Sequence, residues 1–470
     1  MSQRQGGWRS ARHVAPLPQT PRAIAAQTHQ PRAAGPAIAA RIRRVAASVA
    51  DQRWSVSFVA ILAYTASAVT YRVPLVAPAV VGALLGLVLE KERIVFPTFM
   101  ALFFMFVAWA SLSYSGSFAP EWTSDEIVVL LKLSVIAFAI ANVIRNGWRA
   151  RIFVIFFLAC FGAFPVRGTL LNYFVIGYTR FGRALWNFIY ANSNDLAALT
   201  FFPLSMCVAL ALTEKKGWVR YAALAGCGVL PLMILLTQSR AALIGLVVSI
   251  LLFFILHSHG KRLRTLLTAL ALSVLTLPFV PSSAWQRFAG LSQVTSSTTI
   301  QYADPEGSAE ARSLVWRVAR TIIADHPITG IGLGAYSVAH NRYSAGMPIS
   351  NSAKGFRDTH STYLNIAAEM GLVGLGIFIA MILVALIEAE VTRRRAKHIP
   401  RSQWILALQL GLIAFLVAGI FGSFSKLAFL YVQLAFLWAT TNLTRQELAA
   451  SAAPVAGAVG SVRRQRGGWR

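Results

Sequence analysis

The feature that most constrains the fold of this chain is a series of apolar runs, each 16–27 residues long, that recur along most of its length. As helices, runs of this length approach or exceed the thickness of the hydrocarbon core of a bilayer. They do not alternate apolar and polar residues with a period of two, which excludes a transmembrane β-barrel. Charged residues make up 13% of the sequence, far below the quarter typical of soluble domains. We therefore predict an all-α, polytopic membrane protein.

The runs predict about twelve transmembrane helices, and an even number puts both termini on one side of the membrane. The expected spans are about 55–70, 73–89, 94–112, 127–144, 151–166, 194–212, 218–236, 240–256, 265–280, 362–388, 403–422 and 427–442.

The net charge of +27 is distributed as membrane topology requires. Short loops such as "EKER" (90–93), "TEKKGWVR" (213–220) and "TRRRAKHIPR" (392–401) are basic and fall on one side of the predicted spans. The opposite loop "SYSGSFAPEWTSDE" (113–126) has no Lys or Arg. By the positive-inside rule, both termini lie in the cytoplasm. The charge therefore gives no reason to expect nucleic acid as a partner, and membrane lipids are the expected surroundings.

These observations divide the chain into five parts. Residues 1–53 and 443–470 are polar, basic and without an apolar core, and we expect them to be disordered cytoplasmic tails. Residues 54–280 hold transmembrane helices 1–9, and residues 362–442 hold helices 10–12. Between them, 281–361 is predicted to form a loop domain on the outer face. Loops of this length are usually functional.

One helix is predicted within the outer loop. The segment "AEARSLVWRVARTIIADHP" (309–327) places Arg312, Trp316 and Arg320 on one face at helical spacing. The helix should end at Pro327, before the glycine-rich turn "TGIGLG" (329–334).

Several cations lie on the predicted outer face, where the positive-inside rule does not require them: Arg167, Arg180, Arg183 and Arg240. A guanidinium close to the hydrocarbon is costly unless it pairs or lines a wet cavity. Arginine also binds phosphate oxygens in a bidentate manner and stays charged. These residues therefore indicate a pyrophosphate clamp at the outer membrane boundary. The alternative is that their side chains reach the lipid headgroups.

A polar strip, "RDTH" (357–360), precedes the tenth apolar run. Asp358, Thr359 and Ser361 are all suitable N-caps, so His360 should lie at the start of a helix. The positive end of a helix disfavours imidazolium, and a neutral imidazole can act as a general base. A structural role is the alternative for a histidine at this position.

Two further histidines, His326 and His340, lie on the predicted outer face. His326 precedes Pro327 at a helix end, and no helix is expected around His340. Glu369, farther along the tenth span, should be protonated or paired and should make a structural contact between helices. The acidic residues and the three cysteines show no metal-ligand spacing, so neither a metal nor a cofactor is expected.

Three of these stretches together resemble the O-antigen ligase and polymerase superfamily of bacterial envelope enzymes. They are "TQSRAALIGL" (237–246), "RSLVWRVARTIIADHPITGIGLGAYS" (312–337) and "HSTYLNIAAEMGLVGLGIF" (360–378). The segment "RFGRALWNFIYANSNDLAAL" (180–199) is a weaker match to an Arg followed by an Asn-rich helix start. Where the family often has His-Asn, this chain has His360-Ser361, and serine can still cap the helix.

The resemblance implies a GT-C-like architecture in the bacterial inner membrane, with the active site facing the periplasm. It implies a metal-independent glycosyltransferase that moves a glycan from undecaprenyl diphosphate to a hydroxyl acceptor. Arg240 would bind the diphosphate with help from Arg180 or Arg183, and His360 would act as base or orient the acceptor. We expect further substrate binding from the cationic and aromatic groups nearby: Arg312, Arg320, Arg357 and Trp316.

The acceptor decides which enzyme this would be. Lipid A–core as acceptor makes an O-antigen ligase, which one large outer loop and twelve spans favour. A second carrier-linked glycan makes an O-antigen or exopolysaccharide polymerase, and a protein Ser or Thr makes an oligosaccharyltransferase. A secondary transporter is the alternative outside the enzymes, but no inverted repeat or pair of broken helices is visible.

Overall fold

The computed structural model describes residues 54–90, 94–257 and 308–452, together with a few positions between 267 and 285. All belong to one unit, Arg53–Arg470. The described residues form helices, turns and loops, and the extended pairing among them is a single isolated bridge between Arg180 and Arg183. The prediction of an all-α fold is confirmed for this part of the chain. The predicted tail 1–53 lies outside the described residues.

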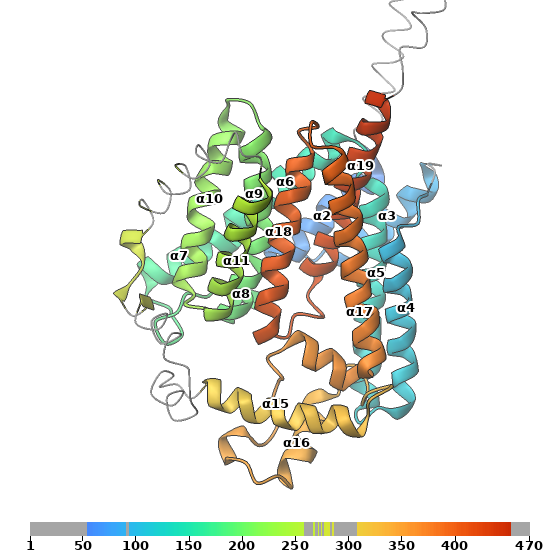
Figure 1. The fold of residues 1–470 in the computed structure, drawn as a ribbon, viewed down its shortest axis with the longest axis vertical. Helices are drawn as coiled ribbons and strands as arrows, with labels where there is room; N and C mark the ends of the chain where they lie inside the picture. Colours follow the sequence, from blue (N-terminus) through green and yellow to red (C-terminus); the bar gives the residue numbers. More distant parts are fainter. Residues whose placement is uncertain are drawn as a thin grey trace, which may run out of the picture. The chain divides into compact units, whose positions relative to one another are not determined.

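Figure 1 shows the helices, most of them running side by side. They are α2 (Val56–Thr70), α3 (Val76–Leu89), α4 (Thr98–Leu112), α5 (Pro120–Val143), α6 (Gly147–Phe161), α7 (Arg167–Leu171), α8 (Ser193–Leu199), α9 (Phe201–Thr213), α10 (Trp218–Leu236), α11 (Arg240–Leu256), α15 (Ser308–Asp325), α16 (Tyr336–Ala345), α17 (Thr362–Arg395), α18 (Ser402–Ala418) and α19 (Ala428–Ala452).

Seven helical stretches among the described residues are long and apolar enough to cross a membrane, and three shorter helices, α2, α3 and α11, are also apolar. The chain is therefore a multi-pass membrane protein. Most of the expected ninth span, 265–280, lies outside the described residues, so the number twelve stays a prediction. The seven stretches are Thr98–Gly116, Pro120–Val143, Gly147–Ile176, Ser193–Thr213, Trp218–Leu236, Thr362–Arg395 and Ser402–Phe421.

The core is built from helices far apart in the sequence. Helix α18 packs on α9 and α11, α17 packs on α4, and α19 packs on α5. Aromatic pairs join two further helices to α19: Phe103 of α4 stacks on Tyr431 with 4.3 Å between ring centroids, and Phe153 of α6 meets Phe436 at 4.9 Å. Such pairs stabilise a bundle beyond the area they bury. The C-terminal helices are thus held between the N-terminal ones, which fixes the turn between α18 and α19.

The fifth predicted span, 151–166, is longer in the structure. Helix α6 continues through a π-helical turn at Gly162–Val166, then α7, and ends with a second π-helical turn at Asn172–Ile176. Pro165 lies inside the first π-helical turn, and a proline cannot donate the backbone hydrogen bond of a regular α-helix. The stretch ends at Gly177, whose φ of 74° is left-handed. The span predicted from hydropathy ends at 166, next to this proline, whereas the helical stretch continues past it.

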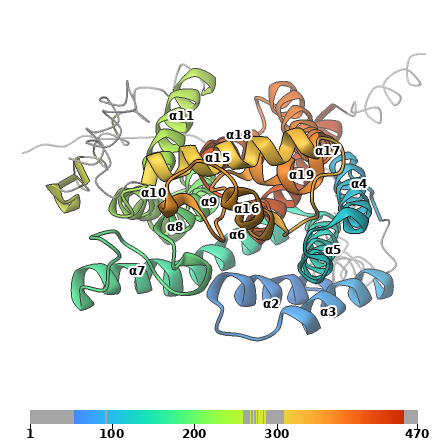
Figure 2. The same ribbon diagram turned by 90° about the horizontal axis from the view of Figure 1, so that it is seen from below.

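Helices α15 and α16 lie across one end of the helices (Figures 1 and 2). The predicted loop helix is confirmed as α15, and its buried residues Val315, Val318 and Ile322 pack against Tyr336 and Ala339 of α16. Helix α16 was not predicted. At the other end of the chain, the tail was expected to begin at 443, but α19 continues to Ala452 because "NLTRQELAA" contains many good helix formers.

Helix α17 is interrupted at Gly371, which corrects the prediction of one continuous span over 362–388. Gly371 has φ 68° and ψ −178°, which is not helical. The glycine-rich turn supplies hydrogen bonds to carbonyl groups next to the break: the N–H of Ile331 donates to Ala368 at 3.1 Å, and that of Gly332 to Glu369 at 2.9 Å. A polar backbone group can leave the helical pattern within a membrane protein only if protein replaces the lost partner.

Close packing explains why the break falls on a glycine. A Cβ on Gly371 would overlap the carbonyl oxygen of Ile328, and one on Gly330 would overlap the backbone of Glu369. On the other side of the break, Leu372 N donates to Pro327 O at 2.8 Å. The turn 327–334 and the break in α17 therefore pack tightly together, and this packing fixes the position of the α17 segment that precedes Gly371.

The predicted topology can be tested in a variant with all three native cysteines replaced by alanine. A cysteine at Ser350, which is exposed after α16, should react with a membrane-impermeant maleimide in intact spheroplasts. A cysteine at His398, exposed between α17 and α18, should react only after permeabilisation. Reaction of both from the same side would contradict the predicted arrangement.

Candidate active site

His360 lies directly before α17 in a strained backbone conformation. Ser361 is the N-cap, since its hydroxyl accepts from the N–H of Leu364 at 3.5 Å. His360 itself has φ 49°, a left-handed value that is uncommon outside glycine. Strained backbone persists where the surroundings hold it, and it occurs often at functional sites. The predicted position of His360 at the helix start is confirmed.

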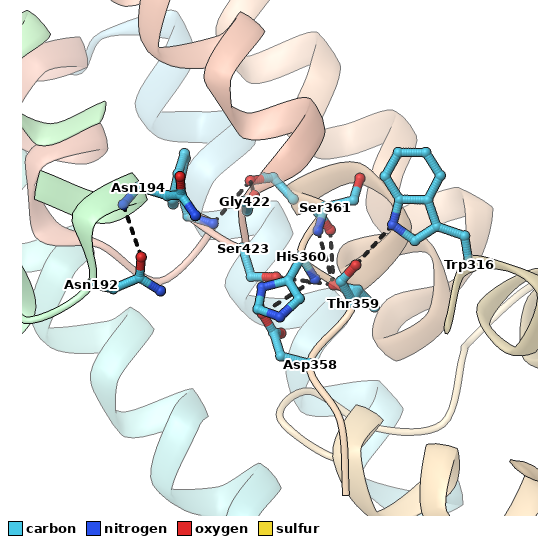
Figure 3. Close-up of polar contacts among 11 residues, drawn as sticks. Asn192, Asn194, Trp316, Asp358, Thr359, His360, Ser361, Gly422 and Ser423 are labelled. Atoms are coloured by element: carbon cyan, nitrogen blue, oxygen red, sulfur yellow. Dashed lines mark hydrogen bonds and ion pairs between the residues drawn. The ribbon is translucent and has the colours of Figure 1, made fainter. Parts of the chain in front are cut away.

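The residues beside His360 are tied to two other parts of the chain (Figure 3). Thr359 is fully buried, and its hydroxyl lies 3.0 Å from that of Ser423. Its carbonyl oxygen accepts from Trp316 Nε1 of α15 at 2.9 Å. Thr362 donates to Gly422 O at 2.7 Å. The loop is therefore fixed on both sides of His360 while its imidazole stays partly exposed.

Asp358 orients the imidazole. One carboxylate oxygen lies 3.2 Å from His360 Nδ1 and also accepts from the backbone N–H of His360 at 3.2 Å. The contact favours the tautomer with the proton on Nδ1, as in other carboxylate–histidine pairs. The other ring nitrogen, Nε2, is then the basic one. The side chain of His360 is 46% exposed, so this nitrogen can meet a substrate.

The charges around His360 favour a neutral ring. Partial burial lowers the pKa of the imidazole, the Asp358 carboxylate raises it, and the positive charges of Arg312 and Arg357 lower it again. The net direction is below the ordinary histidine value. A histidine with a lowered pKa is mostly unprotonated at neutral pH, which suits a general base.

The N-terminus of α8 lies on the other side of the site. Figure 3 places Asn192 and Asn194 there, with Asn194 beside Gly422. Asn192 is the N-cap and accepts from Asn194 N at 2.8 Å, while Asn194 Oδ1 accepts from Arg183 Nη2 at 2.7 Å. The next residue, Asp195, interacts electrostatically with Asp358. This repulsion between two carboxylates shows that the arginine side of the site is close enough to the histidine side for their charges to interact.

Arg183 also reaches the corner between α10 and α11. Its Nε donates to Thr237 O at 2.8 Å, and Gln238 Nε2 donates to Gly182 O at 3.1 Å. Gln238 has a left-handed φ of 52°, the strained position of this corner. Arg240 follows as the first residue of α11 and is half-buried. The structure thus brings the 180–183 segment next to Arg240.

The other predicted binding residues differ in their surroundings. Arg312 is half-buried on α15 with its charge acting on His360, and Trp316 is fastened to Thr359. Arg357 is exposed, donates to Lys354 O at 3.2 Å and also acts on His360. Three predicted cations are exposed, and within the described part of the chain their side chains make no hydrogen bond or ion pair with the residues of the site: Arg167, Arg180 and Arg320.

A partly buried ion network that the sequence did not predict supports the site. Lys426, just after the turn that holds Thr359, lies 3.0 Å from Glu126 of α5 and 3.9 Å from Glu369 of α17. Glu369 also accepts from the N–H of Tyr336 at the start of α16 at 3.3 Å, so the predicted structural contact with another helix is confirmed. Burial lowers the pKa of Lys426, but Glu369 and Glu126 outweigh it and the pKa is raised. The lysine therefore stays charged and links the turn before α19 to α5 and α17.

The two other histidines have structural surroundings. His326 Nε2 lies 3.3 Å from the hydroxyl of Tyr343, and its ring meets Phe118 edge-on. His340 is fully buried, with Nδ1 2.8 Å from Gly355 O. The expectation that no helix surrounds His340 is wrong, since it lies inside α16. Within the described ranges, no group of three or more His, Cys, Asp or Glu residues could hold a metal ion.

Comparison with known families identifies part of the chain. Residues 223–379 match the family model described as O-Antigen ligase, and this range contains both Arg240 and His360. The match covers about a third of the chain and runs from α10 to the middle of α17. Comparison with curated proteins found no match.

Proposed function

We propose that this chain is an O-antigen ligase, a glycosyltransferase, because residues 223–379 match the family model described as O-Antigen ligase and contain both Arg240 and His360. The superfamily uses lipid-linked glycans. The proposed donor is a glycan on undecaprenyl diphosphate, and the proposed acceptor is a sugar hydroxyl of lipid A–core. The enzyme lies in the bacterial inner membrane with both termini in the cytoplasm, and its site faces the periplasm.

His360 carries the catalytic part of the proposal. Its imidazole is partly exposed, is oriented by Asp358 and has a lowered pKa, while the residues on both sides are fixed. As the acceptor hydroxyl oxygen forms a bond to the anomeric carbon of the donor, Nε2 takes the hydroxyl proton. The bond between that carbon and the diphosphate oxygen breaks, and its electron pair leaves on undecaprenyl diphosphate.

The arginines stabilise the leaving group. Arg240 at the start of α11 and Arg183 beside it are proposed to bind the diphosphate, because guanidiniums can bind phosphate oxygens in a bidentate manner. Guanidinium N–H donors placed there stabilise the negative charge that develops on the departing diphosphate in the transition state. On the acceptor side, Arg312, Arg357 and Trp316 lie around His360 and are proposed to bind the acceptor glycan.

The proposal is tested by reconstitution with defined acceptors. Purified enzyme in liposomes should transfer the glycan from an undecaprenyl-diphosphate donor to lipid A–core, and a deletion strain should accumulate lipid-linked glycan. Chain growth on a second donor would identify a polymerase, and glycan on a protein Ser or Thr an oligosaccharyltransferase. Uptake of a solute by the same liposomes, without transfer, would identify a transporter.

The charges around His360 predict a pH profile. Because His360 must be neutral to act as base, kcat should rise with pH along an acid limb that lies below the ordinary histidine pKa. Replacing Asp358 with Asn removes a charge that stabilises imidazolium, so the limb should move to lower pH. Replacing Arg357 with Gln removes a repulsive charge, so it should move to higher pH. Shifts in the same direction for both variants, measured as kcat against pH, would contradict this assignment.

A further inference from the structure

A cavity lies at the opposite end of α17 from His360. This cavity of about 410 Å³ separates the last turns of α17 and α19. Arg395 follows Gly371 by 24 residues, roughly 36 Å along a helix, so this cavity is separate from the proposed active site. The lining residues are Val391, Thr392, Arg395, Arg445, Leu448 and Ala449.

The two arginines of the cavity differ in whether their guanidinium groups are paired. Arg445 Nη2 lies 3.2 Å from a carboxylate oxygen of Glu388, and its Nε donates to the Thr392 hydroxyl at 2.9 Å. Arg395 is exposed, and among the described residues it has neither an ion pair nor a hydrogen-bonding partner. The guanidinium of Arg395 is therefore available to an anion that enters the cavity.

The acidic groups nearby are already paired with other cations. Glu390 binds Arg393 at 2.7 Å and Arg394 at 2.6 Å, and Glu447 binds Arg401 at 2.8 Å. The helix dipole of α17 places partial negative charge at its C-terminus, which opposes an anion. The cations of this end outnumber the acids and offset that effect: Arg393, Arg394, Arg395, Lys397, Arg401 and Arg445 against Glu388, Glu390 and Glu447.

Apart from the two arginines and the buried Thr392, the lining is apolar and at least partly exposed. Val391 is 42% exposed, and Leu448 and Ala449 face it from α19. The cavity lies where α17 changes from an apolar sequence, which ends near Ile387, to a run of arginines. In a membrane helix this change marks the boundary between hydrocarbon and headgroups. A ligand here must therefore present both an anionic group and an apolar chain.

We propose that this cavity binds an anionic phospholipid of the surrounding membrane. Arg395 would bind the phosphodiester, Arg445 would add its positive field, and the first methylenes of an acyl chain would lie against Val391 and Leu448. Basic pockets between transmembrane helices are suited to such headgroups. A free phosphate shares the anionic chemistry but would gain nothing from the apolar side of the cavity.

Native mass spectrometry of the full-length protein in detergent tests the proposal with phosphatidylglycerol, phosphatidylcholine and inorganic phosphate as probes. We expect phosphatidylglycerol to bind more tightly than phosphatidylcholine. Arg395→Gln should weaken the binding of phosphatidylglycerol about fivefold, the usual worth of one cation near an anionic membrane surface. Arg394→Gln is the matched control: it removes the same charge from a residue that is paired with Glu390, and binding should be unchanged.

A second variant separates lipid binding from an effect on folding. Ala449→Trp fills the cavity without changing charge, and it should lower binding as Arg395→Gln does. Equal losses in Arg395→Gln and Arg394→Gln would show attraction to the basic face as a whole and overturn the proposal. Wild-type binding by Arg395→Gln or Ala449→Trp, or equal binding of phosphatidylcholine, would also overturn it. Displacement of the lipid by millimolar phosphate would assign the site to a free anion instead.

Discussion

The His360→Ala variant should insert, purify and bind the donor normally, yet transfer the glycan roughly two to four orders of magnitude more slowly, the usual worth of general acid–base catalysis. Normal folding is expected because the imidazole is partly exposed and the loop is held by Thr359 and Thr362. The measurements are single-turnover transfer in liposomes and binding of the carrier diphosphate. Full activity of this variant would remove His360 from the mechanism.

Two further substitutions at His360 separate its possible roles. His360→Gln keeps hydrogen bonding but cannot take up a proton near neutral pH, so recovery of most activity would mean that His360 only orients the acceptor. His360→Asn controls for the backbone, because Asn tolerates a left-handed φ better than Ala. If Asn restores activity and Gln does not, the strained conformation rather than the base is what the loop requires.

The other histidines of the 308–361 region are internal controls. His326→Ala should leave transfer nearly unchanged, since its ring contacts Tyr343 and Phe118 and not the site. His340→Ala should lower thermal stability instead, because the ring is fully buried in α16. Loss of transfer in a well-folded His340→Ala protein, with His360→Ala active, would show that the wrong histidine was chosen.

The parts of the fold that the sequence predicted depend on local information. Helix α15 was found because an amphipathic pattern ends at Pro327, and the start of α17 because Ser361 and its neighbours are N-cap types. Most apolar runs became helices near their expected positions. Their ends were less accurate: α5 begins at Pro120 and not at 127, and α19 continues past its apolar part.

The break in α17 could not be read from the same signals. Gly371 occurs in an apolar run, and glycines are common in transmembrane helices without interrupting them. What permits the break is the turn 327–334, some forty residues earlier, whose N–H groups replace the lost helical partners. The sequence shows both glycine-rich segments but not that they contact each other. The contact between Lys426 and Glu126 is likewise invisible in the sequence, because the two residues are far apart along the chain.

The site was predicted in part for a similar reason. Motif positions identified His360, Arg240 and the 180–183 pair, and the Asn-rich start of α8 carried a signal in "ANSND" (191–195). The hydrogen bond from Arg183 to Asn194 depends on three-dimensional placement, and so does the contact of Trp316 with Thr359. The difference between Arg180, which is exposed, and Arg183, which is held, became visible only in the structure.

Substitution of Arg240 is expected to have the second large effect on transfer. Arg240→Ala should lower transfer by roughly two to three orders of magnitude, the cost of removing one donor from a developing negative charge. Arg240→Lys should also be impaired although it keeps the charge, because an ammonium cannot bind two phosphate oxygens as a guanidinium fork does. Donor affinity and kcat should be measured separately, since a group that acts on the leaving diphosphate affects kcat. Wild-type transfer by Arg240→Ala, at wild-type protein level, would remove Arg240 from the mechanism.

Arg183 and Arg180 form a matched pair within one short segment. Arg183 joins Thr237 O and Asn194 Oδ1 through two separate N–H groups, so neither Gln nor Lys can replace both contacts. Arg183→Lys should therefore lose activity, and the corner before α11 should become less ordered, measurable as faster hydrogen exchange at 237–240. Arg180→Gln removes an equal charge from an exposed side chain and should transfer at close to the wild-type rate. If Arg180→Gln lost as much activity as Arg183→Lys while exchange at 237–240 stayed unchanged, the exposed arginine would be the one that binds the diphosphate.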